Sequence, residues 1–473
     1  MAACHGPKKS GLNSVGIERI QVPDRWQSME SGVDHSISSG WLADFNDQRL
    51  VELVDEGLSN NPSIKLNEAQ LRSIQDSIII SKSAQLPRVS SSLAGSYSGG
   101  TARQPAGGYN GWNFNDIYSG GINVSWELDV WGKLQNREDA AIKDYEAALA
   151  NYRGTRLSLA ANIARSYCNL ITARSQLELS INTLDIFKSN LSITERNYIA
   201  GDPTATALAV QFARNNVASA QRSVTIRELS VNDASRALEI FLGRYPGADL
   251  EITGELPALV SEVPFGLPSD LLMRRPDLVA AAARLEASTQ RKIIAQKNLL
   301  PSVNLSGGGN VRDNNLADLL SSPQSIAANV AASLSQPIYQ GGALRAQVRQ
   351  AKESELISIE SFANVALSAF REVESAIDRE NSLAQQEESL KVELSQAGLA
   401  EQQASRDYSE GLVDILSVLE AQRRAFNARN SEISLRNSRI QNRITLHLAL
   451  GGDFNVNEEQ FSSSNLEVKS DNR

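Results

Sequence analysis

The chain has 473 residues and a formal net charge of −9, with 41% apolar and only 5% aromatic residues. The negative charge argues against a general nucleic-acid binder, because neutralising phosphates requires a basic surface. No uninterrupted apolar run reaches the ~18 residues of a transmembrane helix, which excludes a helical integral membrane protein. The low aromatic content suits long, narrow helices packed along small-residue seams better than several compact cores.

The N-terminus carries a cysteine in an unusual setting. Cys4 follows Ala2 and Ala3, small residues of the kind that end a lipoprotein signal, but the apolar part of such a signal is missing. We expect that this part was removed and Met1 added, or that the native start lies upstream. The second cysteine, Cys168, lies in a strongly helical stretch and is expected to be a small buried apolar residue rather than a disulfide partner.

A helix bounded by prolines occurs twice. The stretches from Asn61 to Pro87 and from Arg275 to Pro301 both carry proline at the second position and end in Leu-Pro. Three further landmarks recur in the same order at a nearly constant offset. They pair Gly132 with Gly341, Tyr198 and Gly201 with Tyr408 and Gly411, and Gly243 with Gly451. The period is too long for a solenoid of many units, so the sequence indicates a single duplication.

This duplication divides the chain into five parts. They are an N-terminal segment over 1–43, a first repeat over 44–243, a linker rich in Pro and Gly over 244–267, a second repeat over 268–452 and a polar tail over 453–473. We expect the N-terminal segment to carry the lipid anchor discussed below. The tail is expected to be poorly ordered or to lie on the exterior.

Each repeat begins with the same series of predicted elements. A first helix ends where Leu-Pro interrupts the helical hydrogen-bond ladder. Two strand-like stretches follow, separated by loops rich in Gly, Asn and Ser near residues 99–115 and 310–325. The clearest strand alternates apolar and polar residues, which is typical of a strand with one apolar and one wet face. Its apolar residues are Ile122, Val124, Trp126, Leu128 and Val130.

Very long helices come next. The stretches 134–198 and 343–408 contain no proline and one glycine each, so each helix can extend for roughly 95 Å. Gly201 and Gly411 fit the left-handed residue that closes a helix, and return helices are predicted over 205–242 and 413–450. A strict seven-residue apolar repeat, which imposes a left-handed supercoil, marks the first long helix. Its members are Ile163, Leu170, Leu177, Leu184, Leu191 and Tyr198.

Three motifs give the chain a resemblance to a known family. They read "GLPSDLLMRRPDL" from Gly266, "YSEGLVDILSVLEAQRRAF" from Tyr408 and "LALGG" from Leu448. With the "CHGP" start, they resemble the TolC/OprM-type outer-membrane efflux channels over nearly the whole chain. Two positions depart from the family pattern without touching the architecture: Ala282 stands where Glu is usual, and Leu299 where Phe is common.

The resemblance implies a mixed α and β fold, in which a long coiled-coil α-helical barrel continues into a transmembrane β-barrel. Four strands per chain cannot close a barrel, so trimerisation is expected to complete it. The implied function is a passive outer-membrane exit duct of a tripartite efflux system, exporting drugs and other small toxic molecules, and not an enzyme. The implied partners are two further copies, a periplasmic adaptor, an inner-membrane transporter and outer-membrane lipid. Acyl chains such as palmitate on Cys4, which the resemblance marks as the lipid-attachment residue, are expected instead of a cofactor.

The resemblance also assigns roles around the second helix turn. Leu416 and Glu420 match the apolar and acidic positions that constrict the closed tip of the tunnel, where an acidic ring favours cations. Tyr408 and Arg423 match positions that link neighbouring helices in the closed state. Without the family, Leu416 reads as coiled-coil core and Glu420 as a solvated charge. The turns where an adaptor is expected to dock are marked by Gly201, Gly411 and Val413.

Other functions stay open on the sequence alone. A type I protein-secretion duct has the same architecture but passes proteins. A soluble coiled-coil scaffold would share the heptads, although the alternating strands and glycine-rich loops do not favour it. The sequence contains no recognisable catalytic or metal pattern, because His5, His35 and His447 are scattered and "GGG" from Gly307 lacks the Lys-Ser/Thr of a phosphate loop.

Overall fold

The chain folds into the mixture of long helices and strands that the sequence predicts. The computed structural model describes residues 23, 25–28, 40–101, 103–104, 107–109, 111–201, 206–252, 254–257, 268 and 271–452. Cys4, most of the segment 1–43, residues 253 and 258–267 of the linker and the tail 453–473 lie outside these residues. Of the residues that the structure describes, 70% are helical and 14% lie in strands, which confirms the mixed α and β class.

Two compact units each draw on both repeats. The sheet unit takes its described residues from 70–149 and 280–362. The helical unit takes them from 17–69, 150–279 and 363–473. Each unit therefore combines equivalent parts of the two halves, and the duplication does not correspond to two separate globular domains.

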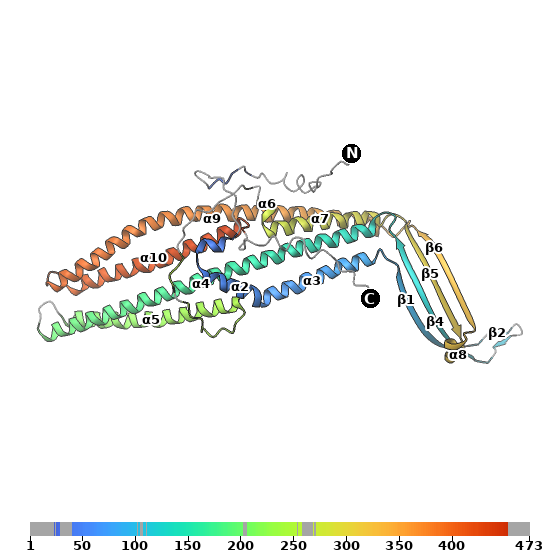
Figure 1. Cartoon of the computed structure of the whole chain (residues 1–473), viewed down its shortest axis with the longest axis horizontal. Helices are drawn as coiled ribbons and strands as arrows, with labels where there is room; N and C mark the ends of the chain where they lie inside the picture. The colour runs from blue at the N-terminus through green and yellow to red at the C-terminus, as the bar shows by residue number, and fades with distance from the viewer. Residues whose placement is uncertain are drawn as a thin grey trace. The chain divides into compact units, whose positions relative to one another are not determined.

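The sheet unit contains four long antiparallel strands. In order across the sheet they are β1 (Arg88–Gly100), β4 (Asn113–Leu128), β5 (Ser302–Asp313) and β6 (Ser325–Ser335), so that β4 and β5 join the two repeats (Figure 1). The four predicted strands are confirmed, although β4 ends before Val130. A short extra pair, β2 (Arg103–Gln104) with β3 (Gly108–Tyr109), and helix α8 (Leu316–Ser321) were not predicted.

The register gives the sheet one apolar and one polar face. Val89 lies opposite Val124, Val124 opposite Gly307, and Gly307 opposite Val330, so these positions share a side. Val330 is 84% exposed, and the apolar side chains of its face are largely uncovered within the chain. The exposed members are Val89, Leu93, Tyr97, Phe114, Ile122, Val124, Leu305, Ile326, Val330 and Leu334. The alternate positions are mainly Ser, Asn, Ala and Gly.

The helices that lead into the sheet begin and end at the prolines. Helices α3 (Pro62–Ser83) and α7 (Pro276–Lys297) start on proline, whose fixed φ suits the first turn of a helix. At their ends, the N–H of Leu86 donates to Ser83 and that of Leu300 to Lys297, at 3.1 and 3.0 Å. Proline follows each leucine and the chain enters β1 or β5, as predicted.

The long and return helices are also confirmed. Helices α4 (Lys133–Ile199) and α9 (Ala343–Ser409) have 67 residues each. They are followed by α5 (Ala207–Leu242) and α10 (Ile415–Ala449). In the part of the chain that the structure describes, no helix combines the length and the apolar character needed to cross a membrane. The remaining short elements are η1 (Trp41–Phe45), α2 (Gln48–Asn60) and α6 (Leu271–Arg274).

Within the single chain, the predicted heptad row of α4 is buried over part of the helix only. Ile163 and Leu170 are fully buried and Leu184 is nearly so, whereas Tyr198 is 49% exposed. A second row of residues, each three positions after a member of the predicted row, forms the other side of the packed face of α4. This row contains Ala173, Ser180, Phe187 and Thr194. Its polar members Ser180 and Thr194 are 2% and 0% exposed, so small polar residues continue the seam toward the end of α4.

The glycine landmarks of the two repeats mark close backbone contacts. A Cβ on Gly243 would lie 2.9 Å from the carbonyl oxygen of Asn60, and one on Gly451 would lie 3.1 Å from the carbonyl carbon of Arg274. Both glycines adopt positive φ, 75° and 69°. The end of each return helix therefore packs against the start of the first helix in its own repeat. The main apolar core lies at one such junction, where α2, α4, α5 and the end of α10 meet.

Candidate functional site

The turn between α9 and α10 has a defined hydrogen-bond pattern. Gly411 takes a left-handed φ of 72°, and its N–H donates to the carbonyl of Tyr408 at 3.1 Å. The N–H of Leu412 donates to Asp407 at 2.8 Å, which completes the Schellman motif of a helix C-terminus. Gly201 has a φ of 79° at the end of α4. The predicted left-handed conformation of both glycines is confirmed, while their docking role stays a prediction.

The return helix α10 begins at a charged cap. A carboxylate oxygen of Asp414 accepts hydrogen bonds from the N–H of Ser417 at 3.0 Å and from its hydroxyl at 2.8 Å. These bonds, the backbone one first, lower the pKa of Asp414. The negative charge is favourable at the positive end of a helix. Val413 lies half-buried just before the cap, and Thr206 caps α5 in the same way through the N–H of Ala209.

A small apolar cluster holds the start of α10 against its neighbours. Ile415 and Val418 are 3% exposed and pack with Leu419 and with Ala209 of α5. Tyr408 packs against this cluster, together with Phe187 and Ala404. Leu416 is not part of the cluster and is 45% exposed. Its side chain is therefore free to contact groups outside the chain, as an aperture residue requires.

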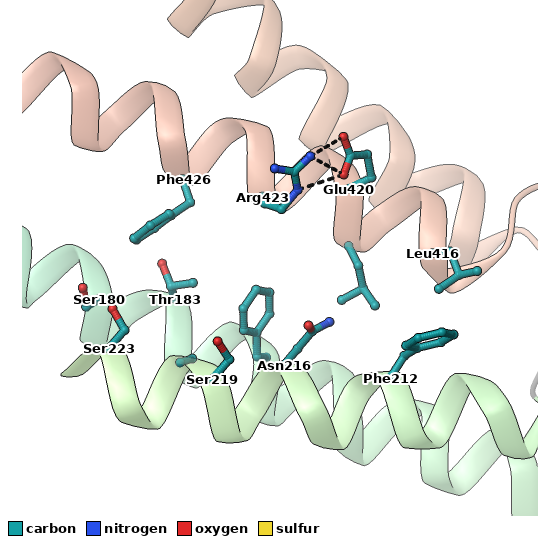
Figure 2. A pocket seen from close by; sticks show the side chains of 13 residues that line it. Ser180, Thr183, Phe212, Asn216, Ser219, Ser223, Leu416, Glu420, Arg423 and Phe426 are labelled. Carbon is teal, nitrogen blue, oxygen red and sulfur yellow. Dashed lines mark hydrogen bonds and ion pairs between the residues drawn. The ribbon is translucent and has the colours of Figure 1, made fainter. Parts of the chain in front are cut away.

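Glu420 lies one turn along α10 and is bound by two arginines of the same helix. Its carboxylate accepts from Nε and Nη2 of Arg423 at 2.9 and 2.8 Å (Figure 2). It also accepts from Nε of Arg424 at 2.9 Å. Arg424 first, and then Arg423, lowers the pKa of this exposed carboxyl. In the single chain the Arg423 guanidinium thus bonds within α10, and the link to a neighbouring helix implied by the resemblance stays a prediction.

A cavity of about 410 Å³ separates this part of α10 from α4 and α5. Figure 2 shows Phe212 and Leu416 at one end of it and Ser180, Ser223 and Phe426 at the other. The wall from α5 consists of side chains at helical spacing, namely Phe212, Asn216, Ser219, Ala220 and Ser223. Sequence reasoning named none of these α5 residues. Their spacing places them on one face, but only the tertiary fold brings that face to Glu420.

The cavity is lined by both apolar and polar side chains. Aromatic rings, hydroxyls, one amide and one ion pair face the cavity. Within the described ranges, no cluster of three or more His, Cys, Asp or Glu residues could hold a metal ion. Cys168 is fully buried as expected, and burial followed by the charge of Asp47 raises the pKa of its thiol to about 12. His447 is also buried and stacks on Trp41, with ring centroids 5.8 Å apart.

Comparisons with known proteins agree with this architecture. The sequence matches the family described as outer membrane efflux protein over residues 53–244 and 267–452. It is 27% identical over 438 residues to the cation efflux system protein CusC of Escherichia coli O6:H1, covering 92% of this chain and 93% of CusC. It is 29% identical over 448 residues to the pyoverdine export outer membrane protein OpmQ of Pseudomonas aeruginosa, covering 92% and 91%. The structure resembles that of the outer-membrane channel OprN, with a TM-score of 0.82, 26% identity and coverage of 92% and 97%.

The family match extends over both sets of helices and strands described above. The resemblance that the sequence motifs indicated is thereby confirmed. Proteins with these names transport solutes and are not enzymes. With most of its length matched in sequence and in structure, this chain belongs to the outer membrane efflux protein family.

Proposed function

We propose that this protein is the passive, trimeric exit duct of a tripartite efflux system in a bacterial outer membrane, and that it exports small molecules. The cargoes named for its relatives, cations for CusC and pyoverdine for OpmQ, are small solutes rather than proteins. These names favour small-molecule efflux over protein secretion. Two such different cargoes also mean that the compounds exported by this chain do not follow from its family.

The observation that carries the proposal is the uncovered amphipathic sheet. Its apolar face is exposed over all four strands, and β1 and β6 form its two edges. An open edge in lipid would leave backbone N–H and C=O groups without partners, at several kcal/mol per group. Pairing β6 of one copy with β1 of the next removes both edges. Three copies would supply twelve strands, enough to close a barrel with an apolar exterior and a polar lumen.

The residues at the Gly411 turn support a gate in this duct. Three copies of the exposed Leu416 would form a dry collar, and three copies of Glu420 an acidic ring. In the conformation described, Arg423 and Arg424 neutralise Glu420, which weakens its attraction for cations. If Arg423 turned toward a neighbouring helix, it would form the link implied by the resemblance and partly free Glu420. Closure and cation preference would then depend on the same arginine.

The proposed partners act from outside the chain. A periplasmic adaptor and an inner-membrane transporter would supply both cargo and the energy for opening, with docking at the turns marked by Gly201, Gly411 and Val413. Acyl chains on Cys4 would hold the N-terminus to the outer membrane. Such an anchor is marginal alone but would add to the hold of a barrel.

The gate is tested by single-channel conductance of the purified full-length protein in planar bilayers. We expect Leu416→Ala combined with Glu420→Ala to raise the conductance. Asp185→Ala is the matched control, since it removes a carboxylate from a similarly exposed pair, with Lys188 on α4. Unchanged conductance of the double variant would place the gate elsewhere.

The duct itself is tested by assembly and by growth. A lipid-reconstituted sample that remained monomeric would contradict the proposal. A deletion strain is expected to become more susceptible to some dyes, detergents, metals or antibiotics. A strain that kept its resistance but lost secreted proteins would instead indicate the secretion duct.

A further inference from the structure

A second cavity, in the sheet unit, has a different character from the one beside the gate. It measures about 600 Å³ and lies among α4, α7 and α9. Helix α7 contributes Arg284, Ser288 and Arg291 at spacings of four and three residues, which places them on one face. The facing residues are Asp144 of α4 and Gln347, Gln350, Ala351, Ser354 and Ser358 of α9. All of these lining residues except Ala351 have polar side chains, and none has an aromatic ring.

Ser288 is an unsatisfied polar group in this wall. The residue is only 6% exposed, and its hydroxyl oxygen is buried without a hydrogen-bond partner in the described structure. The hydroxyls across the cavity differ, because Ser354 donates to the carbonyl of Gln350 at 3.0 Å and Ser358 to that of Ser354 at 2.9 Å. Buried hydroxyls without a partner destabilise a fold and are uncommon. The hydroxyl of Ser288 thus has no partner among the described residues, and the residue that carries it lines the cavity.

The cavity also carries an excess positive charge. The Arg291 guanidinium forms an ion pair with Asp144. Arg284 is exposed and forms no ion pair with any residue that the structure describes. The other charged side chains nearby compensate one another, since Lys143 pairs with Glu286 and Lys292 with Glu355. The guanidinium of Arg284 is therefore the uncompensated charge of this cavity.

We propose that this cavity binds a small phosphorylated sugar or a similarly hydrophilic phosphate ester. A phosphate group presents several acceptor oxygens in different directions, and here donors converge on the cavity from α7 and from α9. The free guanidinium, the hydroxyl of Ser288 and the amides of Gln347 and Gln350 supply these donors. The cavity is much larger than a phosphate ion, and its polar, non-aromatic walls suit a sugar better than a base or an acyl chain.

The phosphate group could also belong to a membrane lipid, but the length of α7 argues against this source. Helix α7 ends at Lys297, thirteen positions after Arg284, which is a rise of about 20 Å at ~1.5 Å per residue. The headgroup layer on each side of a bilayer is only roughly 5–8 Å thick. If the strands that follow α7 lie in the membrane, as proposed above, Arg284 lies outside the bilayer, farther from it than the headgroup layer extends. A soluble phosphate ester is the ligand that fits.

Calorimetric titration of the purified full-length protein with glucose 6-phosphate tests the proposal. Saturable binding is expected, with weaker binding of inorganic phosphate and none of glucose. Arg284→Gln should weaken the affinity at least about tenfold, because it removes a charge-assisted hydrogen bond. Arg345→Gln is the matched control, since Arg345 is exposed on α9 and does not line the cavity; its affinity should equal that of the wild type.

Ser288→Ala separates binding from folding. This variant should also weaken glucose 6-phosphate binding, yet its melting temperature without ligand should stay equal or rise, because a buried hydroxyl without a partner is removed. Absence of saturable binding, equal affinity of Arg284→Gln and the wild type, or equal binding of glucose would overturn the proposal. So would binding of phosphatidic acid in nanodiscs without binding of glucose 6-phosphate, which would assign the cavity to a lipid headgroup.

Discussion

Arg275 connects the beginning of the second repeat to its end, and its removal should loosen the end of α10. Its guanidinium is largely buried and donates to the carbonyl of Ala449 at 3.1 Å. It also contacts the carboxylates of Asp277 at 2.7 Å and Glu372 at 2.8 Å. We consider the variant Arg275→Met, which keeps most of the apolar stem but removes all three contacts.

The magnitude follows from the exposure of the three acceptors. Losing the charged donor to the carbonyl of Ala449 costs about 1–3 kcal/mol, because a buried acceptor is left without that partner. Asp277 and Glu372 are each 46% exposed, so solvent screens these pairs and each contributes only about 0–1 kcal/mol. The expected loss of local stability is therefore about 1–5 kcal/mol.

Amide hydrogen exchange measures this loss where it occurs. The reporting amides are those of Leu450, Gly451 and Gly452, which bond to carbonyls within the last turn of α10. Their protection should fall about 5-fold to 4,000-fold, since each 1.4 kcal/mol is a factor of ten. Arg274→Met makes the same charge change at the exposed neighbouring position and should change protection little. Full protection in Arg275→Met, or an equal loss in Arg274→Met, would refute this account of the "RRPD" motif.

Three further predictions concern titratable groups. Since Arg424 contributes most to the lowered pKa of Glu420, Arg424→Gln should raise that pKa and shift the acid loss of cation selectivity, read from reversal potentials, to higher pH; an unshifted profile would contradict this. Burial first, and then Arg443, lowers the pKa of His447 to about 4, so the unfolded chain binds the extra proton. Stability should fall by up to about 3 kcal/mol as the pH drops from about 6.5 to about 4, and thermal melts of His447→Gln should lose that slope. Cys168, with a raised thiol pKa, should react with an aromatic disulfide reagent only after unfolding, and prompt labelling of the native protein would show that its surroundings open.

Elements whose signals are local in sequence could be predicted before the structure. Alternation in β4, the prolines that bound α3 and α7, and the glycines after α4 and α9 each act within a few residues. These signals act on the backbone of the residues around them, so they determine the type and the order of the long elements. The lengths of α4 and α9 followed from the absence of proline over the same stretches.

What could not be predicted depends on side chains from distant parts of the chain. Thr194 is fully buried in the seam of α4, although a polar residue gives no hydrophobic signal. Phe212 and Asn216 were missed at the gate because they belong to the other repeat and reach α10 only in the folded unit. The bond from Arg423 to Glu420, one turn away on α10, was also missed, while the link of Arg423 to a neighbouring helix stays a prediction. The family resemblance indicated which residues to consider at this site, but not which residues their side chains bond to.

The two repeats use different side chains to bond the carbonyl groups at the end of their return helices. In the first repeat, the amide of Asn61 donates to the carbonyl of Phe241 at 2.8 Å, and its oxygen caps Ser63. In the second, the guanidinium of Arg275 takes the equivalent place and also binds two carboxylates. An amide satisfies one carbonyl, whereas a guanidinium can hold the ends of several helices at once. The first repeat uses a guanidinium as well, because Arg244, just after α5, donates to both carboxylate oxygens of Glu56 on α2. Each repeat thus fixes the end of its return helix with one arginine, so that movement at the Gly411 turn need not loosen the end of α10.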